Sequence, residues 1–317
     1  MKKIILVVTL LVSSLFSLTI QKPDAQFMAT DAVVDLVYNN NKIYAATSAS
    51  CVDIFDIKTK KIINKIKVSK ITDFTGEITD SKVYSVDLTG SKILILSQAE
   101  AGYRRIHFYE NNKTELIISK KEKLYIVKAK FLDENTILLG LLSNEIISYN
   151  IKERKQNWRV QVSQSKFSNF ALDEKKLKVV VADESGNLHI LKTKDGSVIK
   201  VLKDQNLDNV FQVDYKNKIA ATAGQDRRVV IYNTVFNSAY YKMASFLIYS
   251  VGLSPSGQRC GFASDENNNV TVFNTSTKTE IGKFGGNKMT ISNIVFLNEN
   301  EFLVSSDDEA INLYKIK

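Results

Sequence analysis

A short β-strand pattern recurs along this chain at a nearly constant interval. Each copy is an apolar run that ends in an aromatic or aliphatic marker residue followed by a polar one; the copies lie at 52–56, 106–110, 146–150, 188–192, 229–233, 270–274 and 311–315. The marker stands at positions 55, 109, 149, 191, 232, 273 and 314, so the steps are 54, 40, 42, 41, 41 and 41 residues. A fixed period of this length indicates stacked supersecondary units, and no segment between the markers has helical periodicity.

Each repeat has room for four strands. An alternating strand, a polar turn and a more apolar second strand precede each marker strand, and a hairpin signal such as Lys194-Asp195-Gly196 follows it. The fourth strand carries lysine, which blunts an exposed sheet edge. Extra loops at 69–81 and 98–104 account for the one long step.

Seven four-stranded repeats of this length resemble a WD40-like β-propeller. Phe, Tyr or Leu replaces the tryptophan of the Trp-Asp dipeptide in every repeat, and the Gly-His dipeptide is missing. We therefore predict an all-β fold, a seven-bladed propeller with degenerate repeats. The seventh repeat ends after its third strand, and residues 18–30 are long enough to supply the fourth. The prediction is thus a single propeller over 18–317, closed by an N-terminal strand within 18–30.

The first residues have the pattern of a secretory signal. Met1-Lys2-Lys3 is a short positive region, and the apolar run 4–16 is too short to span a bilayer as a helix. We expect a signal peptide over 1–17, cleaved after Ser17, and a periplasmic protein without membrane association after cleavage. An uncleaved membrane anchor is the alternative.

Composition excludes several classes of chemistry. Two cysteines without a CxxC motif and two histidines argue against a disulfide scaffold, a zinc site or a haem protein. Cys51 and Cys260 fall on blades too far apart for a disulfide, and His107 and His189 fall on blades two and four, too far apart to share a metal. No GxSxG or HExxH motif is present, and no paired carboxylates fall in a credible common site. We expect no enzyme activity and no cofactor.

The net charge of +9 comes mainly from lysine, since only seven of the 43 Lys and Arg residues are Arg. The basic residues are spread along the chain, which argues against nucleic-acid binding. Four of the arginines form two matched pairs, Arg104-Arg105 and Arg227-Arg228, directly before the third strands of blades two and five. We take them as candidate contacts for an acidic protein partner. The alternative is that they pair with acidic residues of the same loops, such as Asp226.

Two short motifs narrow the function. The run Ala-Gly-Gln-Asp-Arg-Arg-Val at 223–229 and the run Leu-Ser-Pro-Ser-Gly at 253–257 resemble the NapL accessory proteins of periplasmic nitrate reductase systems. This resemblance implies a non-catalytic, monomeric protein that supports maturation of the reductase or electron delivery to it. Two alternatives stay open: a propeller scaffold for envelope assembly, and a calcium-dependent, lactonase-like propeller hydrolase, which needs Asp, Asn and Glu at the channel mouth.

Gly224, Gly252 and Gly257 are expected in turns.

Overall fold

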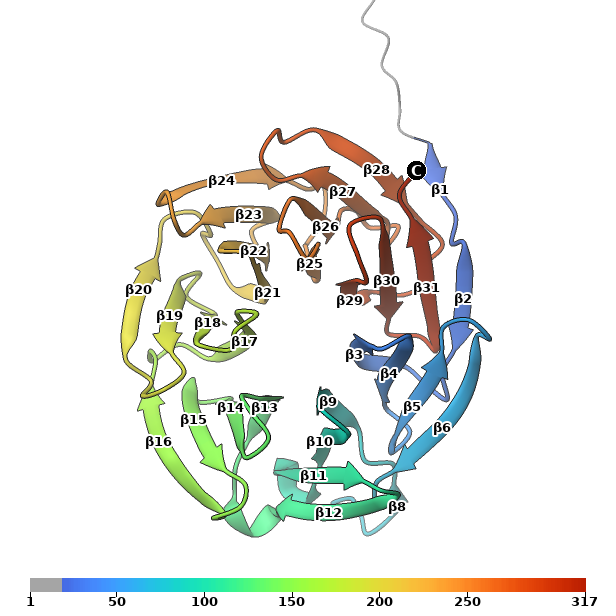
Figure 1. Ribbon diagram of the computed structural model, residues 1–317, viewed down its shortest axis with the longest axis vertical. Helices are drawn as coiled ribbons and strands as arrows, with labels where there is room; N and C mark the ends of the chain where they lie inside the picture. The colour runs from blue at the N-terminus through green and yellow to red at the C-terminus, as the bar shows by residue number, and fades with distance from the viewer. Residues whose placement is uncertain (1–18) are drawn as a thin grey trace, which may run out of the picture.

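Seven small β-sheets surround a central axis like the blades of a propeller (Figure 1). This computed structural model describes residues 19–317, so the predicted signal peptide at 1–17 lies outside the described residues. The predicted seven-bladed propeller is confirmed, and the seven marker segments all form strands, each the third of its blade.

The first five blades are each built from four consecutive antiparallel strands. Blade 1 contains β3 (Val33–Asn39), β4 (Lys42–Thr47), β5 (Cys51–Asp56) and β6 (Lys61–Lys67). Blade 2 contains β9 (Val83–Thr89), β10 (Lys92–Gln98), β11 (Arg104–Glu110) and β12 (Lys113–Ile118). Blade 3 contains β13 (Ile126–Phe131), β14 (Thr136–Leu141), β15 (Glu145–Asn150) and β16 (Lys155–Gln161). Blade 4 contains β17 (Phe167–Leu172), β18 (Lys178–Asp183), β19 (Leu188–Lys192) and β20 (Val198–Leu202); blade 5 contains β21 (Val210–Lys216), β22 (Ile219–Gly224), β23 (Arg228–Asn233) and β24 (Ser238–Met243).

The last two blades include strands from the start of the described chain. Blade 7 contains β29 (Ile291–Phe296), β30 (Glu301–Ser306), β31 (Ala310–Lys315) and, as its outer strand, β2 (Ala25–Met28). The antiparallel pairing of β2 with β31 confirms the predicted ring closure. Blade 6 contains β25 (Val251–Leu253), β26 (Arg259–Ala263), β27 (Val270–Asn274) and β28 (Glu280–Phe284). Its edge carries β1 (Ile20–Gln21) as a parallel fifth strand, which the repeat does not predict.

The long first step of the repeat contains two insertions. Between blades 1 and 2, β7 (Ile71–Thr72) and β8 (Ile78–Thr79) form a small hairpin. Within blade 2, the loop before β11 contains the 3-10 turn η1 (Glu100–Gly102), and a second turn, η2 (Lys120–Glu122), leads into blade 3. Both insertions coincide with the extra loops expected at 69–81 and 98–104.

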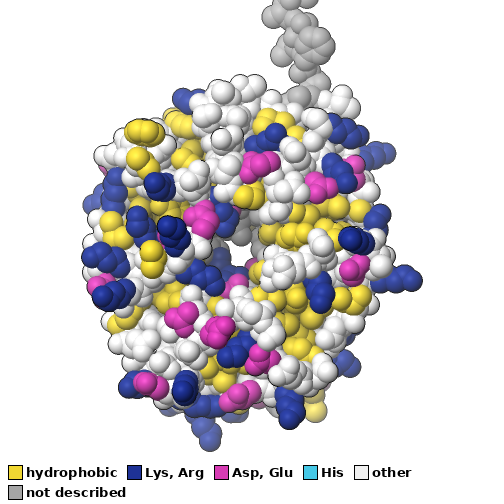
Figure 2. All heavy atoms as spheres, in the orientation of Figure 1, with side chains coloured by type: hydrophobic (Ala, Val, Ile, Leu, Met, Phe, Trp, Pro, Cys, Tyr) yellow, Lys and Arg dark blue, Asp and Glu magenta, His cyan; other side chains and the backbone are white. Residues whose placement is uncertain are grey.

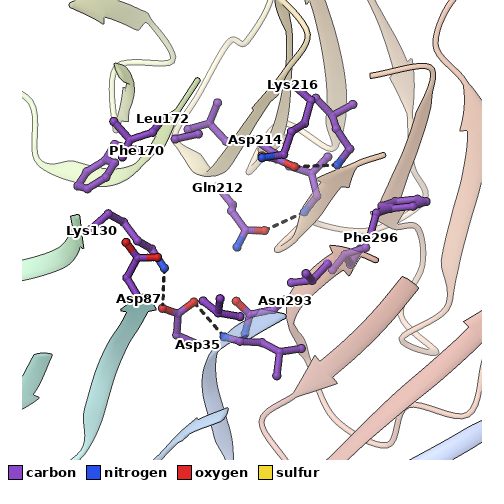
Figure 3. Close-up of a pocket in the computed structure, with 18 of the residues that line it drawn as sticks. Asp35, Asp87, Lys130, Phe170, Leu172, Gln212, Asp214, Lys216, Asn293 and Phe296 are labelled. Atoms are coloured by element: carbon purple, nitrogen blue, oxygen red, sulfur yellow. Dashed lines mark hydrogen bonds and ion pairs between the residues drawn. The ribbon is translucent and has the colours of Figure 1, made fainter. Parts of the chain in front are cut away.

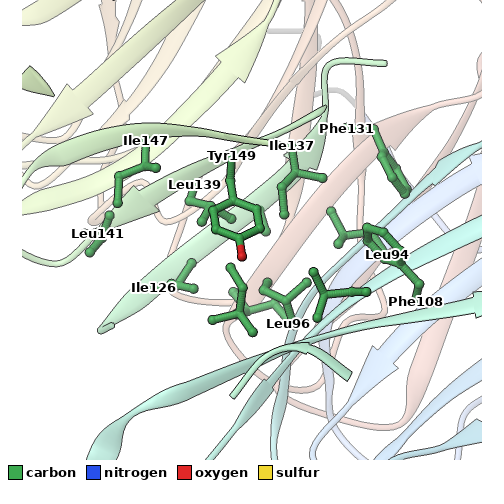
Figure 4. Packing of buried hydrophobic residues seen from close by; sticks show 14 residues of the cluster. Leu94, Leu96, Phe108, Ile126, Phe131, Ile137, Leu139, Leu141, Ile147 and Tyr149 are labelled. Carbon is green, nitrogen blue, oxygen red and sulfur yellow. The ribbon is translucent and has the colours of Figure 1, made fainter. Parts of the chain in front are cut away.

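The hydrophobic core is divided among the junctions between blades. Seven clusters of buried side chains occur among the described residues, and each lies between two neighbouring blades. Figure 4 shows the junction of blades 2 and 3, where Leu94 and Phe108 face Phe131 and Tyr149. Both faces of a middle strand are therefore buried, which explains continuous apolar runs such as Val179–Ala182. Outer strands such as β6 are mostly exposed and rich in lysine.

Candidate functional site

The first strands of the blades enclose a central channel. Figure 2 shows the ring hollowed at its centre, with charged side chains beside the opening. Two chambers of about 270 and 420 Å³ lie along the axis. Asp35, Lys128, Gln212 and Asn293 line both chambers; we call this level of the channel the waist.

A β-bulge that recurs in the first strands determines where the waist residues lie. Six of the seven first strands shift register against their second strand just after their first residue, which is a β-bulge. The residue that follows the bulge is polar in all six of these blades: Asp35, Ser85, Lys128, Asn169, Gln212 and Asn293. In blade 6, where the register does not shift, the polar residue Ser250 stands directly before β25, and its carbonyl accepts from the Ala263 amide. Sequence reasoning on the third strands missed this ring, although a polar residue at one position of six first strands is a detectable signal.

Channel side chains hold neighbouring blades together. Asp35 accepts a hydrogen bond from the Val86 amide of the next blade at 2.9 Å. Asp87 accepts one from the Phe131 amide at 2.7 Å. In blade 5, Asp214 and Gln212 accept from amides of β25 at 2.8 and 2.9 Å. Because each carboxylate or amide satisfies a backbone donor at the channel wall, these residues have a structural role.

Lys130 completes this arrangement at the junction of blades 1, 2 and 3. Its Nζ lies 3.3 Å from Asp35 Oδ2 (Figure 3). The same Nζ donates to the Val86 carbonyl at 2.7 Å. Burial opposes ionisation of Asp35, but the charges of Lys130 and Lys128 and the Val86 amide outweigh it and lower the pKa of the carboxyl. Burial likewise opposes the charge of Lys130, yet Asp35 and Asp87 raise the pKa of this amine. The pair is therefore ionised at neutral pH.

Lys128 has a different environment two residues earlier. Its Nζ donates to Asn169 Oδ1 at 2.9 Å and lies 5.5 Å from the centre of the Phe170 ring. Among the described residues it has no carboxylate within ion-pair distance, although Asp35, Asp87 and Asp214 act on it from farther away. Burial and the charge of Lys130 lower the pKa of Lys128 to about 8. Lys128 is thus a half-buried cation that its own protein only partly compensates.

The four candidate arginines lie on one face of the ring, in two places that the structure does not bring together. We call this the loop face; it is formed by the loops between second and third strands and by the connections from blade to blade. Arg105 donates to the Ser69 carbonyl and Ser81 hydroxyl at 2.6 and 3.0 Å, and Arg104 stacks over Tyr84 at 4.0 Å. Arg228 donates to the Gln205 carbonyl at 2.8 Å and stacks over a tyrosine. These three side chains brace loops.

Arg227 is the exposed member of the set. Its backbone has a positive φ of 62°, and its side chain makes no hydrogen bond or ion pair with the residues that the structure describes. The alternative was that the arginines pair with acidic residues of their own loops. Arg228 does so, since its Nε lies 3.9 Å from Asp226. Of the predicted contacts, Arg227 is therefore the one that is available to a partner.

Exposed apolar side chains gather on the same loop face. Seven large ones lie in its loops: Phe74, Ile78, Tyr125, Leu142, Leu207, Phe246 and Met289. Phe74 is fully exposed and Leu207 is 67% exposed. The opposite face, formed by the hairpin turns and here called the turn face, carries Leu177, Val235 and Phe236. Scattered apolar residues are normal on a surface, but their concentration on one face is typical of an interaction site.

The cysteines and histidines lie as the repeat positions predict. Cys51 and Cys260 are free and buried on blades 1 and 6. His107 is buried next to Ser97, with 3.1 Å between Nε2 and Oγ, while His189 lies 3.8 Å from Asp183 on blade 4. Burial, with the charge of Arg105, lowers the pKa of His107 to about 4. In the part of the chain that the structure describes, no three His, Cys, Asp or Glu side chains are grouped to hold a metal ion.

Residues 19–317 contain no helix that is long and apolar enough to cross a membrane.

Comparison with known proteins shows the fold. No protein-family model and no curated protein matches the sequence. Among solved structures, a chain of the "Crystal Structure of Mitotic Checkpoint Complex" superposes with a TM-score of 0.76 at 14% identity, covering 93% of this chain and 92% of the other. As many as 1867 solved chains match, so the likeness does not single out one activity. The chain therefore has the fold of a seven-bladed β-propeller.

Proposed function

We propose that this protein is a non-catalytic accessory protein that binds a protein partner through its loop face. The observation that carries the proposal is that seven large exposed apolar side chains lie in the loops of this face, against three on the turn face. Leu207 and Phe246 belong to the connections that contact the loop of the exposed Arg227. A rigid ring holds such loops in fixed positions, so little ordering entropy is lost when they bind.

The partner we propose is a component of a periplasmic nitrate reductase system. The motifs at 223–229 and 253–257 support this, together with the signal-like pattern of residues 1–17, which supports a periplasmic location. In this proposal the propeller assists maturation of the reductase or electron delivery to it, and acts as a monomer.

Matched substitutions on the two faces test the docking face. Arg227→Ala and Leu207→Ser change exposed loop-face side chains, whereas Arg154→Ala and Phe236→Ser change exposed side chains of the turn face. In pull-downs with the purified reductase, we expect the loop-face variants to weaken capture about tenfold and Arg227→Ala to reduce its salt dependence. The turn-face variants are expected to bind like the unaltered protein.

Equal capture by all four variants would place the contact elsewhere. The nitrate assignment is tested separately, by measuring periplasmic nitrate reduction in a strain that lacks this protein. Unchanged reductase activity and reductase abundance in that strain would refute the assignment while leaving the docking face to be judged by the pull-downs.

A further inference from the structure

The smaller channel chamber has donors on its floor and aromatic rings on its wall. It measures about 270 Å³, near the lower end of small-molecule sites, and Lys128, Asn169 and Gln212 line it at the waist. These three residues stand at the same position of blades 3, 4 and 5, so their side chains come from adjacent strands around the ring.

Lys128, Asn169 and Gln212, here called the floor of the smaller chamber, have N–H groups that no described protein group accepts at normal hydrogen-bond distance. Lys128 uses one of its three N–H groups on Asn169 Oδ1. The Asn169 amide nitrogen makes no hydrogen bond within residues 19–317, and the Gln212 amide nitrogen makes only a long contact of 3.4 Å to the Ser292 carbonyl. Unused donors beside an unpaired ammonium are complementary to an anion.

The channel aspartates do not compete for this position. Asp35 pairs with Lys130 and accepts the Val86 amide, while Asp87 and Asp214 accept amides of the following blades. Their oxygens are held at the wall by these contacts, so the three aspartates, of which Asp35 also lines this chamber, compensate the charge of Lys128 only in part and from a distance.

The chamber wall supplies a flat apolar surface. Phe211 and Tyr249 are stacked, with ring centres 5.3 Å apart and planes 14° apart, and Phe246 lies 6.5 Å from Tyr249. Phe211 and Tyr249 line the same chamber as Lys128. A ligand that reaches the floor through this chamber therefore passes an aromatic wall.

We propose that the smaller chamber binds a small carboxylate with a flat, apolar body. The carboxylate accepts hydrogen bonds from Lys128 and from the Asn169 and Gln212 amides, and the body lies against Phe211 and Tyr249. The smaller chamber adjoins the loop face at Phe246, but this proposal does not rest on the docking proposed there.

Benzoate is the probe that tests the site. Isothermal titration calorimetry at pH 7 and low salt is expected to show millimolar binding to the full chain, the strength expected of a ligand this small. Lys128→Met is expected to weaken benzoate at least tenfold. The matched control is Lys216→Met, which removes a lysine that lines only the larger chamber. Thermal unfolding of each variant verifies that it is folded.

Further probes separate charge from shape. Benzyl alcohol, which lacks the charge, is expected not to bind detectably, and acetate, which lacks the ring, is expected to bind at least tenfold more weakly than benzoate. The proposal is overturned if benzoate binds the Lys128→Met variant as well as it binds the unaltered protein. Tighter binding of inorganic phosphate than of benzoate would refute the proposal that the ligand has an apolar body. Tighter binding of benzylammonium than of benzoate would also refute the proposal, because the channel aspartates and not Lys128 would then determine which charge the chamber binds.

Discussion

Asp35 of blade 1 accepts a hydrogen bond from the Val86 amide of blade 2, 2.9 Å away, and the same carboxylate faces Lys130 of blade 3 at 3.3 Å. One side chain thus joins three consecutive blades at the channel wall.

Replacing Asp35 with alanine is expected to destabilise the fold by about 2–3 kcal/mol. The change leaves the Val86 amide without its acceptor and Lys130 without its counter-ion. Asp35→Asn keeps an acceptor and should cost about half as much. Urea unfolding measures both variants, and a wild-type free energy of unfolding for Asp35→Ala would refute the structural role.

Acid is expected to weaken the ring through His107. The pKa of this buried imidazole is about 4 in the folded chain, against about 6.5 when exposed, so the unfolded state binds more protons between these values. The free energy of unfolding should therefore fall by about 2–3 kcal/mol as the pH drops from 7 to 4 on account of this residue. The variant His107→Gln should lack that part of the pH dependence, and parallel pH profiles of the two proteins would contradict the assignment.

Lys128 is expected to reduce stability at neutral pH. Its pKa of about 8 lies below the ordinary lysine value, so the folded state binds this proton less tightly than the unfolded state does. Stability should then rise with pH from about 8 towards 10. Lys128→Met should be more stable than the unaltered protein at pH 7, with the difference shrinking as the pH approaches 10. A less stable Lys128→Met at pH 7 would show that the lysine is structural.

Phe27 of the closing strand is expected to carry much of the ring closure. It is 1% exposed, and its ring meets Phe55 of blade 1 edge-on at 5.8 Å, so Phe27→Ala should cost about 3–5 kcal/mol. Met28→Ala on the same strand is the matched control, since Met28 is 47% exposed and should cost under about 0.5 kcal/mol. Thermal unfolding distinguishes the two, and similar losses for both would argue against the closure.

Gly252 allows blades 6 and 7 to approach each other closely. A Cβ at this position would lie 2.2 Å from the Ile294 carbonyl oxygen, whereas one at its cross-strand partner Gly261 would lie 3.3 Å from a side-chain methyl. We expect Gly252→Ala to cost about 3 kcal/mol or more and Gly261→Ala clearly less. Chemical unfolding of both variants tests the difference, which equal costs would disprove.

The repeat predicts the architecture because it reports local periodicity. Marker strands such as 188–192 and 270–274 have the boundaries expected from the sequence. Each is a short run rich in apolar residues, and a turn signal stands at each of its ends. Gly224 and Gly252 were expected in turns, which is wrong: Gly224 is the last residue of strand β22, and Gly252 lies in strand β25. Close backbone approach between blades, which requires a glycine there, leaves no local signal.

The polar ring that lines the channel was not foreseen for a similar reason. Whether a lysine such as Lys128 faces an axis or the outside depends on a bulge and on six other blades. The arginine pairs were predicted directly before the third strands, but Arg104, Arg105 and Arg228 lie within β11 and β23, and only Arg227 precedes its strand. The neighbouring loops hold the Arg105 guanidinium at Ser69 and Ser81 and leave Arg227 exposed. The position of a residue within the repeat predicts on which face of the ring its side chain lies. Whether that side chain is free to contact a partner depends on the neighbouring loops, which the repeat does not predict.

The pairing of β2 with β31 sets the order in which the molecule can be completed. Residues 25–28 leave the ribosome early, yet their partners at 310–315 are translated nearly 290 residues later. Until then, six blade junctions can assemble while the seventh stays open, with an unpaired strand edge on each side. The final seam can therefore form only after residues 310–315 have been made, and products truncated before them would retain the exposed edges by which proteases and chaperones recognise incompletely folded chains.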